Sequence, residues 1–169
     1  MTATQVLSSS FTIASLAVVR AAGQSNFPVN GSGSTYGFTT ATLQSGSSVE
    51  LYGGNQDVPG SDHGITSYSI LKLLGEGNKT MTDDFPVADS LILTSPVIFD
   101  DNGAALIYGV ASVLRYNMAG DSIPSRQTSQ STGDELPAAS SPRLVVLDNP
   151  KDVQLTCLLY TSPSPRDRT

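Results

Sequence analysis

The chain has 169 residues, of which 38% are hydrophobic, 7% aromatic and 14% charged, with one Cys, one His and no Trp. This length suits one ordinary domain or part of a larger one, and no apolar run reaches the roughly 18 residues of a membrane-spanning helix. One Cys and one His exclude an internal disulfide framework and the usual multi-Cys or multi-His metal centres. The net charge of −6 argues against a general phosphate-binding surface.

The first predicted element is a helix over 4–22, because apolar side chains recur there at helical spacing and Gly23 follows its end. A secretory signal peptide is the alternative, since residues 11–19 are apolar and small residues follow them. However, no Lys or Arg precedes this stretch, and Arg20 interrupts its end.

Two β-prone runs come next, over 35–43 and 48–52. The four residues between them include Gly46, so the pattern predicts a β-hairpin with two antiparallel strands. A second helix is predicted over 64–74, with Ser61 or Asp62 as its N-cap.

The segment 82–99 is ambiguous, because its apolar triplets at 91–93 and 97–99 suit either buried strands or short helical turns. The clearest helix is predicted over 103–118, after an acidic start at 100–102 and with a wide apolar stripe. Residues 121–143 are rich in Ser and Pro, which indicates a mobile loop or linker. A short buried strand follows at 144–147.

These elements predict an α+β fold of mixed helices and short antiparallel strands, without an internal repeat. Residues 1–156 are interpreted as an incomplete, amino-terminal fragment of one larger domain. Residues 157–167 look like the in-frame translation of a sequencing adapter, so 157–169 is interpreted as an artefact that packs against nothing. Without this tail the body has 7 basic and 14 acidic residues, a net charge of −7.

Two short motifs lack the residues that their chemistry requires. Gly120-Asp121-Ser122 resembles the start of a lipase signature, but no His follows Ser122 to accept its proton. The run Gly75-Glu76-Gly77-Asn78-Lys79-Thr80 resembles a phosphate-binding loop without the Gly that should stand directly before Lys79. A surface turn explains each motif better.

His63, the only His, adjoins Asp62, but the sequence offers no set of base, nucleophile and orienting group around it. The acidic pair 83–84 and the run 100–103 lack the spacing of a calcium loop, and turn or helix-start chemistry explains both. Asn30 and Asn78 begin glycosylation acceptor patterns that matter only in a secreted protein. We therefore assign no catalytic, cofactor-binding or metal-binding residue, and expect no enzymatic activity from this fragment.

One set of short motifs carries a resemblance over residues 35–124. An acidic-Asn helix start is followed by an apolar helix ending in Leu-Arg and by a Gly-Asp-Ile-Pro-like turn. The matching pieces are Phe99-Asp100-Asp101-Asn102, Ala105-Leu106, Leu114-Arg115-Tyr116 and Ala119-Gly120-Asp121-Ser122-Ile123-Pro124. In this the chain resembles the amino-terminal part of totivirus-like capsid proteins, the shells of double-stranded RNA viruses.

The resemblance implies a structural, self-assembling capsid protein, which would form a homo-oligomer in the virion or the host cytoplasm. Some members carry a cap-removing His after the Gly-Asp-Ile-Pro-like turn, but residues 125–156 contain no His, so that activity is not carried over. A basic arm is also absent, so we expect no strong nucleic-acid binding. The alternative is the first part of a secreted enzyme or surface protein whose catalytic part lies beyond residue 156.

Overall fold

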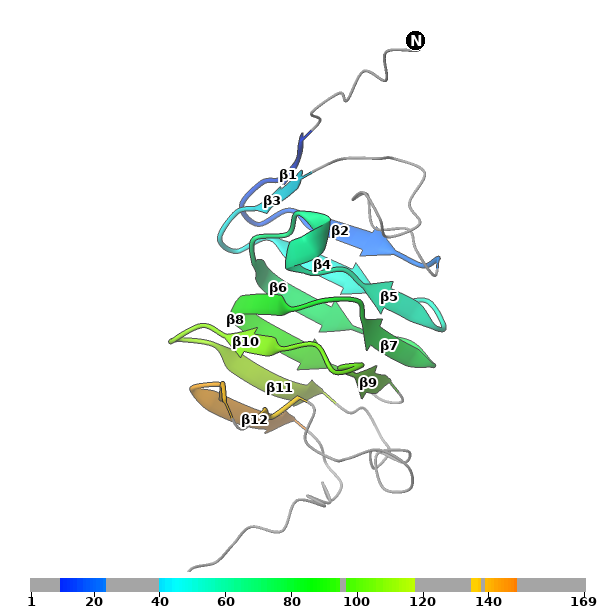
Figure 1. Ribbon diagram of the computed structural model, residues 1–169, viewed down its shortest axis with the longest axis vertical. Coiled ribbons are helices and arrows are strands. Elements are labelled where there is room, and N and C mark those ends of the chain that lie inside the picture. The colour runs from blue at the N-terminus through cyan, green and yellow to red at the C-terminus, as the bar shows by residue number, and fades with distance from the viewer. Residues whose placement is uncertain (1–9, 24–39, 95–96, 118–134, 138, 149–169) are drawn as a thin grey trace, which may run out of the picture.

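The computed structural model describes residues 10–23, 40–94, 97–117, 135–137 and 139–148. These residues form twelve strands and one 3₁₀ turn, and every strand pair among them is parallel. Parallel neighbours need a long connection, so the chain makes a full circuit before each strand lies beside its predecessor. The result is a parallel β-solenoid, and Figure 1 shows its coils stacked from the blue amino-terminal strands to the orange β12.

One side of the solenoid is a long sheet to which each coil contributes one strand. Its hydrogen-bonded path runs β12-β11-β8-β6-β4-β2. The strands are β2 (Val18–Ala21), β4 (Ser48–Leu51), β6 (Tyr68–Leu73), β8 (Phe85–Leu93), β11 (Val113–Asn117) and β12 (Leu144–Asp148). Because this path is unbroken across the stack, the long sheet is the element that joins all the coils by hydrogen bonds.

Two shorter sheets complete the circuit. The short sheet consists of β5 (Gln56–Val58), β7 (Asn78–Met81) and β9 (Ile98–Asp100). On the remaining side, β1 (Ser10–Ile13) pairs with β3 (Thr40–Leu43), and β10 (Leu106–Tyr108) pairs with the first residues of β8. The 3₁₀ turn η1 (Ser61–His63) lies between β5 and β6.

The strand register reveals a repeat in the middle of the chain. Successive partners in the long sheet are Ser48, Ile70, Ser90 and Val113, which lie 20 to 23 residues apart. The first and last coils are longer, at 30 residues from Val18 to Ser48 and 31 from Val113 to Leu144. The expectation of no internal repeat was therefore wrong, because the repeat lies mainly in the strand register and in burial, with few residues identical between coils.

The core lies inside the coils, where side chains at equivalent positions form two columns behind the long sheet. One column contains Val49, Leu71, Leu91 and Leu114, and the other contains Leu51, Leu73, Leu93 and Tyr116. All eight side chains are at most 1% exposed. Alternating residues of the same strands point outward, as the pleat of a β-strand requires.

The fold class is β throughout the described residues, so the predicted α+β fold was wrong. The predicted hairpin was also wrong: β3 and β4 belong to different sheets, and Gly46 lies in the turn that carries the chain from one side to the next. This corner turn is closed by a hydrogen bond from the Ser47 amide to the Gln44 carbonyl. A backbone φ of +79° makes Gly the residue that fits at position 46.

The predicted helix over 103–118 is replaced by β10, a four-residue turn and β11. Leu106 and Tyr108 point inward with strand periodicity, and after the turn Leu114 and Tyr116 do the same. The apolar residues of the expected helical stripe therefore do not share one face, since Val110 in the intervening turn is 99% exposed while Leu106 and Leu114 are buried. Asp100 and Asp101 close turns at Asn102 and Gly103 instead of starting a helix.

The other two predicted helices were wrong for related reasons. Within 64–74, the buried Ile65, Tyr68 and Leu71 are spaced by three residues, but an irregularity in the pairing between Tyr68 and Ile70 produces that spacing in extended chain. Within 4–22, the described part forms β1 and β2. Residues 4–9 lie outside the described residues.

Several predictions of extended structure were confirmed, although the pairing is parallel. The runs 40–43, 48–51 and 144–148 are strands, and the strand interpretation of 91–93 and 98–99 is correct. The strand at 144–148 was expected to be buried, but four of its five residues are exposed. Residues 35–39 of the first predicted strand lie outside the described residues. Part of the predicted linker is packed: the Glu135 carboxylate accepts a 2.5 Å hydrogen bond from the Tyr116 hydroxyl inside the last coil. The interpretation of 157–169 lies outside the described residues. Among the described residues, no helix is long and apolar enough to cross a membrane.

Candidate functional site

The most polar corner of the solenoid lies where the short sheet ends, and Asp83 is at its centre. Asp83 follows β7, and its side chain is only 6% exposed. Its carboxylate accepts hydrogen bonds from the amides of Gly60, Asp62 and His63, which belong to the preceding coil. One buried carboxylate therefore binds the backbone of the turn around η1, where the His63 amide also donates to the Gly60 carbonyl at 3.2 Å.

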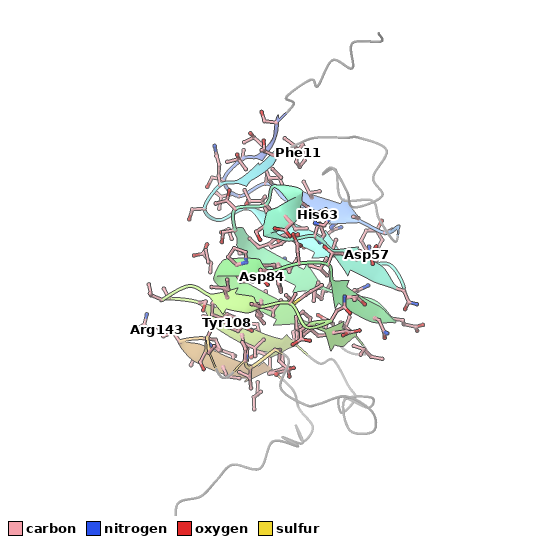
Figure 2. The ribbon with its side chains drawn as sticks, in the orientation of Figure 1. Phe11, Asp57, His63, Asp84, Tyr108 and Arg143 are labelled. Carbon is pink, nitrogen blue, oxygen red and sulfur yellow. The ribbon has the colours of Figure 1, made fainter. Side chains whose placement is uncertain are left out.

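His63 completes this corner. Its Nδ1 lies 3.1 Å from Oδ2 of Asp83, and the Thr82 hydroxyl donates to Oδ1 of the same carboxylate at 3.1 Å. When Nδ1 carries the proton, it donates to Asp83 and leaves Nε2 as an acceptor, with the side chain 17% exposed. Figure 2 shows His63 at the 3₁₀ turn η1, with Asp84 below it in this view. The geometry fixes the imidazole ring, as an orienting carboxylate does in hydrolases.

No nucleophile among the described residues belongs to this arrangement. The nearest hydroxyl, that of Thr82, lies 3.4 Å from Nδ1, the nitrogen already committed to Asp83. Among the described residues, no hydroxyl is hydrogen-bonded to Nε2. The corner can therefore hold a ring and a turn in place, but it lacks the base–nucleophile contact that acyl-transfer chemistry requires.

The adjacent Asp84 ties the same turn to the following coil. Its backbone carbonyl accepts from the Ser61 amide at 2.8 Å, and its carboxylate accepts from the Ala105 amide at 2.8 Å. The coils approach closely here, since a Cβ at Gly60 would lie 2.3 Å from the Asp84 carbonyl oxygen. Turn chemistry was the predicted role of the 83–84 pair, and the hydrogen bonds confirm it.

A second polar cluster lies inside the solenoid, around Lys79. This side chain is fully buried, and its ammonium donates to the carbonyls of Gly53 and Gly54 and to Oε1 of Gln56 at 2.6 to 2.8 Å. The Gln56 amide in turn donates to the carbonyls of Ala21 and Gly23. Lys79 therefore secures turns of neighbouring coils. In the run 75–80, Gly75 and Gly77 form a turn, but Lys79 itself belongs to β7.

Burial lowers the pKa of the Lys79 ammonium from its ordinary value of 10.5 to about 8. The folded state therefore binds fewer protons than the unfolded state between about pH 8 and 10.5, and stability should rise with pH across that range. Burial also raises the pKa of Tyr68 well above 10, so its opposing effect on stability begins only near pH 10.

We predict that urea unfolding at pH 7.5 and 9.5 shows higher stability of the protein at pH 9.5, because of the lowered pKa of Lys79. A Lys79→Met variant should lose this increase, whereas Lys151→Met should keep it; an increase that survives in Lys79→Met would refute the assignment.

The outer face of the long sheet carries a row of charges centred on Glu50. Its carboxylate is 2.8 Å from the Lys72 ammonium and 2.6 Å from Nε of Arg20, and its side chain is only 8% exposed. These three residues are register neighbours on β2, β4 and β6. The hydrogen bond from Lys72 and the one from Arg20 lower the pKa of Glu50 below its ordinary value of 4.5, against the opposing effect of burial.

This depressed pKa predicts an acid-sensitive contribution to stability. The folded state favours the ionised Glu50, so the contribution is present above about pH 4.5 and is lost as the pH falls through the lower, folded-state pKa. We expect Glu50→Gln to lower the free energy of unfolding by about 1 kcal/mol at pH 7, on the usual scale of a hydrogen-bonded ion pair. In urea titrations the deficit should shrink at pH 3. Glu76→Gln, which changes an exposed side chain, serves as the control; an equal deficit at both pH values would contradict the prediction.

The remaining candidate motifs divide into two groups. Residues 120–122 and the acceptor at Asn30 lie outside the described residues. Asn78 lies in β7, and its backbone N–H donates to Oδ1 of Asn55 in the preceding coil. Among the described residues, no group of three or more His, Cys, Asp or Glu side chains is placed to hold a metal ion.

The sequence analysis considered His63 and the acidic pair 83–84 separately and assigned neither to a site, and it missed Lys79, Gln56 and Glu50 as structural residues. The signal was present: Gly54-Asn55-Gln56 and Gly77-Asn78-Lys79 recur at an interval of 23 residues, which is one coil. Aligning the chain with itself at that interval places Gln56 over Lys79. No protein family, curated protein or solved structure matches the chain.

Proposed function

We propose that this chain is a structural protein, a β-solenoid that serves as a scaffold in a surface-exposed or secreted assembly. The observation that carries the proposal is the unbroken parallel path of six strands with a continuous apolar core behind it. A solenoid of this kind is stabilised by contacts between neighbouring coils, so it can be extended without redesigning its centre. Such a geometry suits a shaft or spacer.

The polar corner supports the same interpretation. The Asp83 carboxylate accepts hydrogen bonds from three backbone amides and two side chains, so its acceptor capacity is used within the turn. The Lys79 ammonium likewise donates only inward, to the chain itself. These charged groups hold coils together, which is what a scaffold requires of its buried polar residues.

The capsid role is a more specific form of a structural function, and it stays an untested prediction. The helix on which the resemblance depended is absent, because 99–117 forms strands and turns. The neighbouring nucleotide sequence can separate the two roles. A downstream reading frame for an RNA-dependent RNA polymerase would favour the capsid, whereas a secretion signal and later surface domains would favour the scaffold.

The proposed location can be tested on the protein in its native source. Intact cells or particles are treated with protease, and the chain is then followed with an antibody against residues 40–117. We expect the protein to be accessible to protease without lysis, while a cytosolic marker is protected. Full protection of the chain until lysis would overturn the proposal of a surface-exposed or secreted scaffold.

A further inference from the structure

Each end of the long sheet exposes apolar side chains. At one end, Leu144 and Leu147 of β12 are 53% and 49% exposed. At the other end, Val18 of β2 is 51% exposed. Both strands are at the ends of the hydrogen-bonded path, so each has one edge without a neighbour within the described long sheet. Such an edge is a template for pairing with another chain.

The inward side of β12 is the most informative feature. Val145 is the register partner of Leu114, and Leu147 is the partner of Tyr116. Leu114 and Tyr116 are at most 1% exposed, whereas Val145 is 40% and Leu147 is 49% exposed. The two β12 residues therefore continue the core columns, and none of the described strands forms a next layer over them.

We propose that a second copy of this chain supplies that layer, with its β2 paired in parallel against β12 so that the solenoids stack end to end. This inference rests on the proposed structural role. Continuing the register places Val19 of the second copy over Val145 and Ala21 over Leu147, which extends both core columns. It also places Val18 over Leu144, so the two exposed apolar side chains cover each other.

The charges at the two ends fit the same register. Arg115 pairs with Asp148, which lies two positions beyond its register partner Val146. In the stack, Arg20 of the second copy would lie over Val146 and so reach Asp148 from the other side in the same diagonal relation. The Arg20 side chain is 70% exposed, and that of Asp148 is 44% exposed, so both are accessible for this contact. A head-to-tail contact of this type does not close on itself and produces filaments.

The test is sedimentation of the full chain under reducing conditions over a range of concentrations, with electron microscopy of the concentrated sample. We expect mass to grow with concentration and short filaments to appear. Leu147→Asp should lower the association constant by at least about tenfold, because it places a charge in the new core layer. Val110→Asp, at a 99% exposed corner turn outside β2 and β12, should leave association unchanged.

A pair of charge substitutions tests the register itself. Val18→Lys and Leu144→Glu should each weaken association, and the double variant should recover it, because the two new charges face each other only in the proposed stack. A chain that stays monomeric at every concentration up to its solubility limit would overturn the stacking proposal, as would filaments insensitive to Leu147→Asp. Protease accessibility on intact cells or particles is measured independently, so failure of stacking and failure of the surface role are distinguishable.

Discussion

Replacing Leu91 with Ala is expected to lower the free energy of unfolding by about 2–5 kcal/mol, the usual cost of removing a large buried side chain. Leu91 is fully buried in the central coil, between Leu71 and Leu114 of the neighbouring coils. Ile92, the next residue, points outward and is half-buried. We therefore expect Ile92→Ala to cost less than about 1 kcal/mol, near the range of surface substitutions.

The comparison of these adjacent residues is informative because both variants remove aliphatic carbon from the same strand. Urea unfolding monitored by circular dichroism gives both values under one set of conditions. A reversed order of the two effects would show that the register of β8 is shifted by one residue, since such a shift exchanges the inner and outer faces.

Replacing Asp83 with Ala is expected to cost about 3 kcal/mol or more. The substitution removes a charged acceptor from the amides of Gly60, Asp62 and His63, and a hydrogen bond to a charged group contributes about 1.5–3 kcal/mol. The His63 amide keeps a second acceptor, the Gly60 carbonyl at 3.2 Å. His63→Ala should cost about 1 kcal/mol, because the three amide hydrogen bonds to Asp83 persist.

Thermal and urea unfolding of both variants measure this difference, and Asp62→Ala, which alters an exposed side chain, is the control. Equal losses of unfolding free energy in Asp83→Ala and His63→Ala would mean that the carboxylate acts mainly by binding the His63 imidazole and not the η1 turn. Any hydrolytic activity of the chain that disappears in His63→Ala would contradict the structural interpretation of this corner.

The existence of several strands could be predicted from the sequence, but their arrangement could not. The run 48–51 alternates polar and apolar residues, and 144–147 is a continuous apolar run with two Val; this local signal is independent of which strand is the neighbour. Pairing depends on residues 20 to 31 positions away, and short connections favour antiparallel hairpins as a first expectation. The parallel pairing of these strands therefore could not be predicted from residues 35–52 alone.

The predicted helices show a second limit. Coils of a solenoid combine strands of three to nine residues with turns, and each turn shifts which positions point inward. At 106–114 the apparent helical stripe combined the inward Leu106 and Leu114 with Val110, which is 99% exposed in the turn between the two strands. The acidic residues at 100–101 added to the error, because Asp accepts turn amides as readily as helix-start amides.

The candidate site was predictable only in part. His63 was prominent as the single His, but its partner lies 20 residues further along the chain, and only the coil brings Asp83 beneath it. Lys79 was interpreted within a phosphate-loop pattern because Gly and Lys are typical of such loops. Its role inside the core depends on the carbonyls of Gly53 and Gly54, one coil away.

The most direct test of the parallel β-solenoid is nuclear Overhauser contacts between backbone protons in the isotope-labelled full chain. The fold predicts cross-strand contacts of the parallel type linking Lys72 to Ile92 and Ile92 to Arg115, with none of the medium-range contacts of a helix over 103–117. Continuous helical contacts across 103–117, or antiparallel contacts between Leu43 and Ser48, would contradict it.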